Sequence, residues 1–565
     1  MIAQLERLPT AASGIKGRLL WLVCVLSVAV GLVGWGTQTL VGGVIALWSF
    51  SIAAAALALV LPLPYALVSP LFAGILGWLV DMLPFVILIG WLTVAARWFL
   101  GLVIERRLPR GGVVAWIAVG LVVWTGLGVL AITRLDFRHF LLLLGIQGLA
   151  SAAVLAAADA LRDRRDRLRM IAGLLTYVIV LSVAVLLQWF GIDIGALQNG
   201  ETRRRVEVAY GVDAFPNNIG MIKYARSINA GARELRAGLD GLARRTPGLP
   251  AFDVFRPKFQ AYENSLVVRF RGSARPFEDR LSSAGVRLLF DNVGLAPANT
   301  VPRMRSFPRN ALTYAGICAA LFPFGFLWRW GPDRRRRRFG TLAIAACLFG
   351  AAFSLARGAW VAIAIGILYL FIDAAIDRGK KREVTAAFVI AAIVLTGVFL
   401  IKYRVDPVTG RAGGGASVNT RAELYGDTLA IIKGPLRYIV VGYGTERPRT
   451  ESGTVKEGTR YVPRAGTHST YLNYLFRTGI PGALAIMALY GFAFLYARRA
   501  STSNSSNDRV TPTMSAAAVV IAAAHAVILS LYVEPIYTLT ISLLLGVAAS
   551  WAPASMSLRS RSKTA

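Results

Sequence analysis

The chain has 565 residues, of which 56% are hydrophobic, and a mean hydropathy of +0.57. Soluble globular domains are only about half apolar, so this composition excludes a string of soluble domains and indicates a membrane protein. The net charge of +32 would fit a nucleic-acid-binding protein. However, the arginine runs stand between apolar runs, as cytoplasmic anchors of membrane helices do, so we expect membrane lipids and no nucleic acid as partners.

About fourteen apolar runs are long enough to cross a bilayer. They lie near 19–40, 41–61, 65–80, 84–104, 113–133, 139–160, 170–191, 311–330, 339–354, 357–376, 384–401, 470–497, 513–531 and 535–553. With a cytoplasmic N-terminus, every strongly basic loop falls on the cytoplasmic side, which supports this topology. The short runs 65–80 and 339–354 are its weakest points, because losing one of them would reverse the side of every later loop.

This topology divides the chain into five parts. They are N-terminal transmembrane helices (1–192), an extracytoplasmic insert (193–310), transmembrane helices with a Ser-x-x-Arg-Gly motif (311–401), a large extracytoplasmic loop (402–469), and C-terminal transmembrane helices with a basic cytoplasmic tail (470–565). Both termini are then cytoplasmic. We predict an all-α polytopic membrane protein of about 12–14 transmembrane helices, with a small α+β extracytoplasmic insert.

The insert is too long and too patterned for a plain loop. Residues 218–245 have apolar side chains at helical spacing, residues 265–271 alternate like a strand, and residues 286–290 are a second candidate strand. The insert is rich in arginine, which suits contact with an anionic glycan or a solvated structural cap.

The large loop begins with a glycine-rich stretch, and residues 420–432 then have the pattern of an amphipathic helix. Arg421 lies near the start of this predicted helix. An arginine side chain binds phosphate well because its planar fork makes two parallel hydrogen bonds. Glu423 is either its ion-pair partner or a solvated residue.

Arg357 stands in the stretch Ser354-Leu355-Ala356-Arg357-Gly358-Ala359-Trp360, at the outer end of a predicted span. An arginine at membrane depth is costly and usually marks a functional site. The alternative is an interfacial arginine that extends its charge toward water.

His468 is one of only 3 histidines in the chain, and it ends the large loop. Imidazole has a reference pKa of about 6.5 and can accept a proton at neutral pH, although a lone loop histidine is more often simply solvated. A short apolar segment follows, then a Gly/Pro break at 479–482, then the next span.

These motifs together resemble the O-antigen ligase and O-antigen polymerase superfamily. The pattern is Ser-x-x-Arg-Gly-Ala-Trp in a span, an outer loop with an arginine followed by Gly-x-Gly, and then His-x-x-Tyr-Leu and Thr-Gly-Ile-Pro-Gly. The resemblance covers roughly 340–553. It implies a glycosyltransferase of the bacterial inner membrane, with its active site facing the periplasm, that moves a glycan from undecaprenyl diphosphate to an acceptor sugar without a metal or cofactor. The acceptor is lipid A-core for a ligase and another lipid-linked repeat for a polymerase, which also makes exopolysaccharide.

Carried over by position, the resemblance assigns Arg357 and Arg421 to the donor diphosphate and His468 to catalysis as the base. Two departures from the family pattern stand out. Ser469 replaces the asparagine that usually follows the histidine, and Leu355-Ala356 separates Ser354 from Arg357.

The chemistry of these side chains is consistent with a single, inverting displacement. The two arginines would offset the charge of the leaving diphosphate, and His468 would take the proton of the acceptor hydroxyl. The sequence offers no carboxylate pair for hydrolysis and no acidic cluster for a metal.

Three further residues are possible supports. Tyr471 and Trp360 are either platforms for sugars or members of the interfacial aromatic belt. Glu534 either orients His468 or is a solvated turn residue. A transporter or flippase for an anionic lipid-linked glycan is the alternative function, although we find no internal repeat of the kind that transporters carry.

Overall fold

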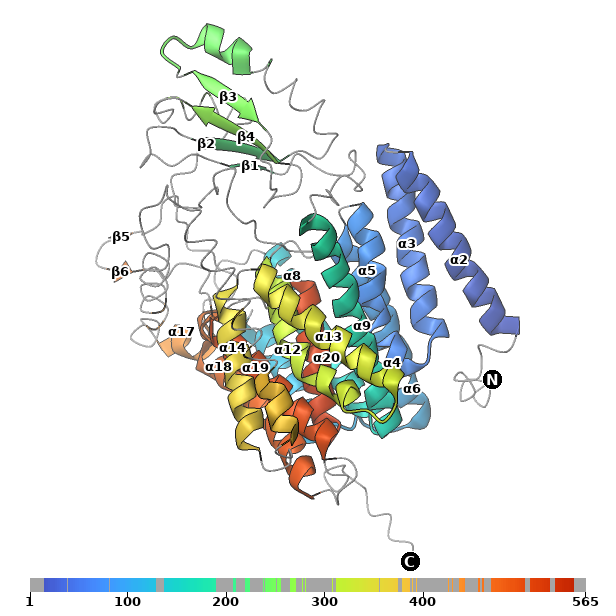
Figure 1. Ribbon diagram of the computed structural model, residues 1–565. Helices are drawn as coiled ribbons and strands as arrows, with labels where there is room; N and C mark the ends of the chain where they lie inside the picture. Colours follow the sequence, from blue (N-terminus) through green and yellow to red (C-terminus); the bar gives the residue numbers. More distant parts are fainter. Residues whose placement is uncertain are drawn as a thin grey trace, which may run out of the picture.

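The structure is a computed structural model of the 565-residue chain. It describes residues 15–37, 39–80, 82–128, 137–189, 207–209, 219–223, 237, 239–249, 251–255, 265–270, 277, 280, 307, 311–354, 356–373, 379–386, 389, 393, 425, 429, 436–442, 456–457, 460–461, 469–503, 509–528 and 534–552. Long helices stand side by side in a bundle, and a small sheet lies above one end of it (Figure 1).

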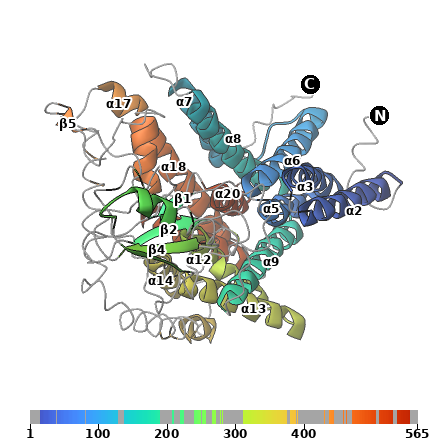
Figure 2. The ribbon, with the colours of Figure 1, turned by 90° about the horizontal axis from the view of Figure 1, so that it is seen from above.

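Helices fill the first part of the chain. They are α2 (Ile15–Gly36), α3 (Leu40–Val60), α4 (Leu63–Ala66), α5 (Ser69–Leu79), α6 (Leu83–Glu105), α7 (Gly112–Gly128), α8 (Phe137–Ala160) and α9 (Arg164–Trp189). In the view from above, α2 and α3 lie at one edge, and α7 and α8 lie side by side (Figure 2).

Helices also dominate the part of the chain that follows the insert. They are α12 (Ala311–Arg329), α13 (Arg334–Phe353), α14 (Arg357–Ile372), α17 (Leu436–Val441), α18 (Thr470–Ser503), α19 (Val510–Ile528) and α20 (Pro535–Ala549). Among the described residues, α12, α19 and α20 form the centre of the bundle. Most of their side chains are buried, and they pack against one another.

Membrane-spanning helices are confirmed. Among the described residues, seven helices are long and apolar enough to cross a membrane, and five shorter apolar helices accompany them. Each predicted span has a helix in the structure except 384–401, most of which lies outside the described residues. The membrane part of the protein is therefore all-α and multi-pass.

The weak span at 65–80 forms two short helices, α4 and α5, rather than one. Pro64 and Pro70 lie in their first turns, where the missing N–H of proline costs nothing. The weak span at 339–354 is part of α13, which begins earlier than expected. Asp333 caps α13, because Arg336 N donates to its carboxylate at 2.7 Å.

The insert contains an antiparallel sheet of four strands. They are β1 (Glu207–Ala209), β2 (Ile219–Lys223), β3 (Phe252–Phe255) and β4 (Ser265–Phe270), in the order β1-β2-β4-β3. The prediction of a strand at 265–271 is confirmed, whereas residues 286–290 lie outside the described residues. A separate two-stranded ribbon pairs β5 (Lys456–Glu457) with β6 (Arg460–Tyr461).

The predicted helix at 218–245 is wrong at its start. Residues 219–223 form the strand β2, which pairs with β1 on one side and β4 on the other. Among the described residues of this segment, 237 and 239–245 are helical. A short apolar run fits either structure by its spacing alone. Pairing on both edges decides for the strand here, because strand preference depends on neighbours more than on the residues themselves.

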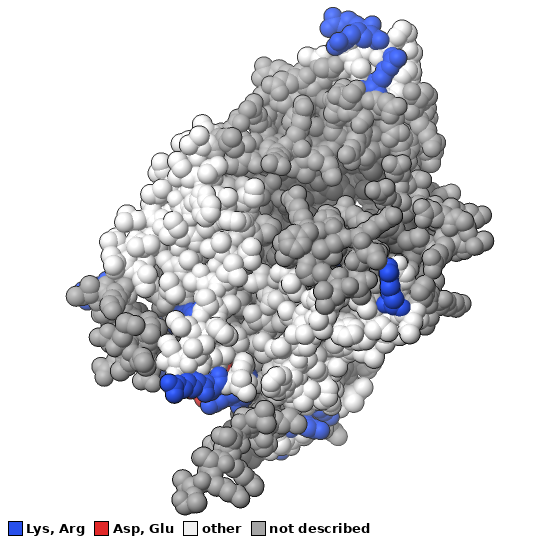
Figure 3. Space-filling model, turned by 180° about the vertical axis from the view of Figure 1, so that it is seen from behind, with Lys and Arg blue, Asp and Glu red and all other residues white. Residues whose placement is uncertain are grey.

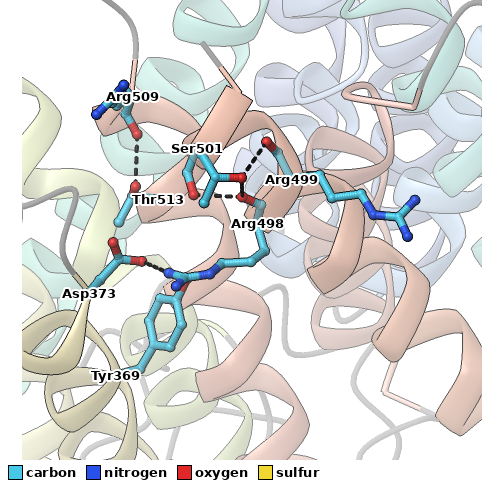
Figure 4. Close-up of polar contacts among 8 residues, drawn as sticks. Tyr369, Asp373, Arg498, Arg499, Ser501, Arg509 and Thr513 are labelled. Atoms are coloured by element: carbon cyan, nitrogen blue, oxygen red, sulfur yellow. Dashed lines mark hydrogen bonds and ion pairs between the residues drawn. The ribbon is translucent and has the colours of Figure 1, made fainter. Parts of the chain in front are cut away.

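The two ends of the bundle can be told apart by connectivity. The insert joins the end of α9 to the start of α12, so we call that end the sheet end and the other the far end. Asp373 follows α14 and accepts a hydrogen bond from Arg498 near the end of α18 (Figure 4). The helices α14 and α18 therefore run in the same direction, and both begin at the sheet end.

Basic side chains at the far end are held by specific contacts. Arg107 donates to Asp159 at 2.7 Å, and the backbone N–H of Arg110 donates to the same carboxylate at 3.0 Å. The hydrogen bond that Arg107 donates to Asp159 raises the pKa of Arg107 above its usual value. Arg167 lies over the ring of Trp551, 3.6 Å from its centroid. These contacts join the α6–α7 and α8–α9 turns to the end of α20.

Candidate functional site

Arg357 is the first residue of α14, directly after the sharp turn from α13. Two side chains fasten this turn by donating to Ala351 O in the last turn of α13: Ser354 Oγ at 2.9 Å and Trp360 Nε1 at 3.1 Å. Both are buried, Ser354 completely and Trp360 to 6% exposure. Trp360 therefore supports the turn that carries Arg357, and it does not offer a free ring face to a sugar.

The start of α14 is electrostatically favourable for an anion. The first N–H groups of a helix have no partner within the helix and carry the positive end of its dipole. The N-cap residue is Ala356, which has no polar side chain to accept from them. The start of α14 thus combines the positive end of the helix dipole with a cationic residue, Arg357.

Ser469 caps the start of α18 and directly follows His468 in the chain. Its Oγ lies 3.5 Å from the N–H of Leu472, and its carbonyl accepts from Asn473 N at 3.0 Å. Serine and asparagine are both strongly preferred N-cap residues. This geometry gives a physical reason why serine can stand where the family usually has asparagine.

The Gly/Pro break predicted after this segment is present. Gly479 has φ 69° and ψ −170°, which interrupts α18, and Pro481 follows. A Cβ at Gly479 would lie 2.2 Å from Val440 O of α17. Residues 470–478 are therefore a separate short helix, which we call the half-helix, and α17 packs against the break that ends it.

The last turn and a half of α19 receives three hydroxyl groups. Tyr471 Oη donates to Ala523 O at 3.2 Å, Ser469 Oγ to Ala526 O at 3.5 Å, and Tyr425 Oη to Val527 O at 3.1 Å. The last carbonyls of a helix have no partner within the helix, so Ser469 and Tyr425 satisfy two of them. Two parts of the chain that are far apart in sequence meet at this helix end.

These contacts bear directly on two of the predicted site residues. Ser469 is the neighbour of His468, and Tyr425 lies four residues after Arg421. His468 and Arg421 themselves lie outside the described residues, as does the side chain of Arg357. The start of α14 lies at the sheet end, as the start of α18 does. The described neighbours of the three predicted residues therefore share one end of the bundle.

Glu534 is the N-cap residue of α20 and is partly exposed. Its carbonyl accepts from Thr538 N at 2.9 Å. One turn further, Tyr537 Oη lies 2.9 Å from Nδ1 of His525 in α19, and both side chains are buried. His525 is thus a packing residue that joins α19 to α20. Glu534 lies at the start of α20, at the sheet end.

Sequence reasoning missed the ion pair at the far end. Arg498 reaches between Tyr369 and Asp373, as Figure 4 shows, and the carboxylate of Asp373 is almost completely buried. In the sequence, Arg498 belongs to one of the basic loops expected on the cytoplasmic side. Tyr369 and Asp373 are four residues apart, which places them on one face of a helix. That spacing indicates that the two side chains can share a partner, but it does not identify Arg498 as that partner.

Comparison with known proteins identifies part of the chain. Residues 342–487 match the family model described as O-antigen ligase. The match begins in α13, includes all of α14 and ends within α18, so it contains the turn at Ser354 and the break at Gly479. No curated protein matches the chain at a significant level.

Proposed function

We propose that this member of the O-antigen ligase superfamily transfers a glycan from undecaprenyl diphosphate to the hydroxyl of an acceptor sugar. At the family level it is a membrane glycosyltransferase of the O-antigen ligase or polymerase type. The observation that carries the finer proposal is the convergence at the end of α19. There Ser469, next to His468, and Tyr425, four residues after Arg421 in the sequence, bind carbonyls of adjacent residues.

In this proposal the arginines bind the leaving group. Arg357, at the positive end of α14, and Arg421 hold the diphosphate of the donor. A bidentate guanidinium matches phosphate oxygens, and fixed cations at a developing negative charge stabilise the transition state. This arrangement requires no metal ion.

His468 acts as the general base in the same proposal. Its imidazole accepts the proton of the acceptor hydroxyl while the hydroxyl oxygen forms a bond to the anomeric carbon. The bond from that carbon to the diphosphate breaks in the same step, and undecaprenyl diphosphate leaves. One displacement inverts the configuration of the anomeric carbon, and His468 then releases the proton to water. Glu534 is a candidate to orient the imidazole, because it stands at the start of α20, at the sheet end where α19 ends.

We also propose that the sheet end faces the periplasm, in the bacterial inner membrane. Figure 3 shows several Lys and Arg side chains along the lower edge of the molecule, below a broad band of uncharged described residues, and a few more at the top and at the right. Basic residues favour the cytoplasmic side, so the far end and both termini would be cytoplasmic. The acceptor is lipid A-core for a ligase or another lipid-linked repeat for a polymerase, and we favour the ligase.

The test is a glycan-profile gel of a deletion strain complemented with wild type or His468→Ala. Wild type should restore a surface polysaccharide, and His468→Ala should not, although it is expressed at the same level. The bands of the strain that lacks the active enzyme separate the two labels. Single unpolymerised repeats on the acceptor would mean that the missing enzyme is a polymerase, and free lipid-linked polymer would mean that it is a ligase. Equal complementation by both proteins would remove His468 as the base and favour a transporter instead.

A further inference from the structure

The half-helix (470–478) makes two polar contacts with the N-terminal part of the bundle. Tyr474 Oη donates to Oε1 of Gln147 in α8, and Trp124 Nε1 in α7 donates to Thr478 O at 2.9 Å. Gln147 and Tyr474 are 6% and 9% exposed. Neither Trp124 nor Gln147 lies in the region that matches the family, which is 342–487.

Both contacts provide hydrogen bonds for polar groups that have no access to water inside the bundle. A buried amide such as that of Gln147 is costly within a span unless it is hydrogen-bonded. Thr478 O is the last carbonyl before the break at Gly479, and backbone groups at membrane depth must find partners within the protein. Trp124 provides that partner. Gln147 and Trp124 thus make hydrogen bonds with Tyr474 and Thr478 that water would make at an exposed site.

The remaining sides of the half-helix are also held. Ser469 and Tyr471 bind the end of α19, and Leu475 and Phe476 pack with Tyr438 of α17. Its two ends are a serine cap and a glycine break, so it is separate from the rest of α18. It is a short rigid unit that the N-terminal helices, α17 and α19 enclose.

We propose that Gln147 and Trp124 are positioning residues for glycan transfer. They fix the half-helix in depth and rotation, and the half-helix holds Ser469, to which His468 is joined by one peptide bond. This inference rests on the proposed function, because it gives the N-terminal helices a part in placing the base. Neither residue is proposed to touch the donor or the acceptor.

The expected size of the effect follows from how steeply catalysis depends on position. A general base must lie within hydrogen-bond reach of the proton it abstracts, and a shift of about 1 Å costs about 100-fold in rate. Loss of one of the two contacts should therefore lower kcat by about 10-fold to 100-fold. The KM for the donor should stay within about 2-fold, because the arginines proposed to bind the donor diphosphate lie on other segments.

The first variant is Gln147→Met, which keeps the length of the side chain and removes the acceptor. Its matched control is Ser151→Ala, one turn further along the same helix. Ser151 Oγ is buried and donates to Ala118 O of α7 at 2.9 Å. The control therefore also loses a buried hydrogen bond between helices, but this bond joins α8 to α7 and does not involve the half-helix. We would measure kcat and KM for the purified full chain with a lipid-linked glycan donor.

Three further variants keep the proposal testable if Gln147→Met folds poorly. Tyr474→Phe removes the same hydrogen bond from the other side. The double variant Gln147→Met with Tyr474→Phe removes both polar groups, which is close to neutral for stability. Trp124→Phe removes the second contact independently. We expect each of them to lower kcat while the KM for the donor is kept.

The outcomes separate the two hypotheses. A lower kcat in the Gln147, Tyr474 and Trp124 variants, with Ser151→Ala at the wild-type value, supports positioning. If Ser151→Ala loses as much kcat as Gln147→Met, or if kcat follows the folded fraction alone, the positioning role is wrong. If the wild-type chain itself transfers no glycan, the proposed function fails first.

Discussion

Arg357 stands at the first position of a helix, where a cation is opposed by the helix dipole. Such a position is unfavourable in isolation, and a bound anion would offset the repulsion. The buried neighbours Ser354 and Trp360 both bind Ala351 O and fix the turn that presents it. These residues therefore give the arginine a defined backbone position, which a surface arginine in a loop would lack.

At this scale we predict that Arg357→Lys loses transfer. Lysine keeps the charge but cannot make two parallel hydrogen bonds to a phosphate. The rate should fall by about 100-fold, measured as transfer from a lipid-linked donor. Arg437→Lys is the control, because Arg437 is exposed on α17 and lies over Tyr438. Near-normal transfer by Arg357→Lys would mean that charge alone is required there.

The helices show which patterns are readable from sequence. Apolar runs predict spans well because every backbone group in a membrane must be paired within its own helix. The break at Gly479 and Pro481 was also predicted, since both residues disfavour a continuous helix. The spacing of the short run at 219–223 predicts helix, but the run forms a strand, because strand conformation depends on partners elsewhere in the chain.

The break in α18 should require glycine at position 479. Its backbone lies in a region that almost only glycine adopts, and a Cβ would meet Val440 O at 2.2 Å. Gly479→Ala should therefore lower the free energy of unfolding by at least about 2 kcal/mol. Gly491→Ala is the control in the same helix, because a Cβ there would point into open space. Thermal unfolding of the two variants in detergent would check this, and equal melting temperatures would contradict it.

Across the whole molecule, long-range contacts set the direction and depth of the helices. The pairs Arg498–Asp373 and Arg107–Asp159 fasten the far end, and the α19 carbonyls fasten the sheet end. Such pairings were not predictable, because one amino-acid sequence does not show how deep each helix lies in the bundle or which of its faces meets a neighbour. The same limit applies to Gln147 and Tyr474, which are 327 residues apart. For His468 and Arg421 the roles remain predictions.

The ion pair between Arg498 and Asp373 should contribute more to stability than an exposed ion pair does. The carboxylate of Asp373 is 2% exposed and its partner Arg498 37%, whereas Asp333 and Arg336 are 50% and 61% exposed. Asp373→Asn should destabilise the protein by about 1–3 kcal/mol, because a charged hydrogen bond is lost at a buried atom. Arg336→Gln should cost less than about 1 kcal/mol. Melting temperatures that rank the other way would show that Asp373 is not a structural link.

The most direct measurement is transfer by the purified full chain in lipid nanodiscs. The donor is a labelled undecaprenyl-diphosphate glycan and the acceptor is lipid A-core, and the reaction is run with and without a chelator. We predict that wild type forms a labelled product of inverted anomeric configuration and that His468→Ala forms none while it still binds the donor. Product formation by His468→Ala at the wild-type rate would contradict the account, as would a wild-type reaction that stops when divalent metal is removed.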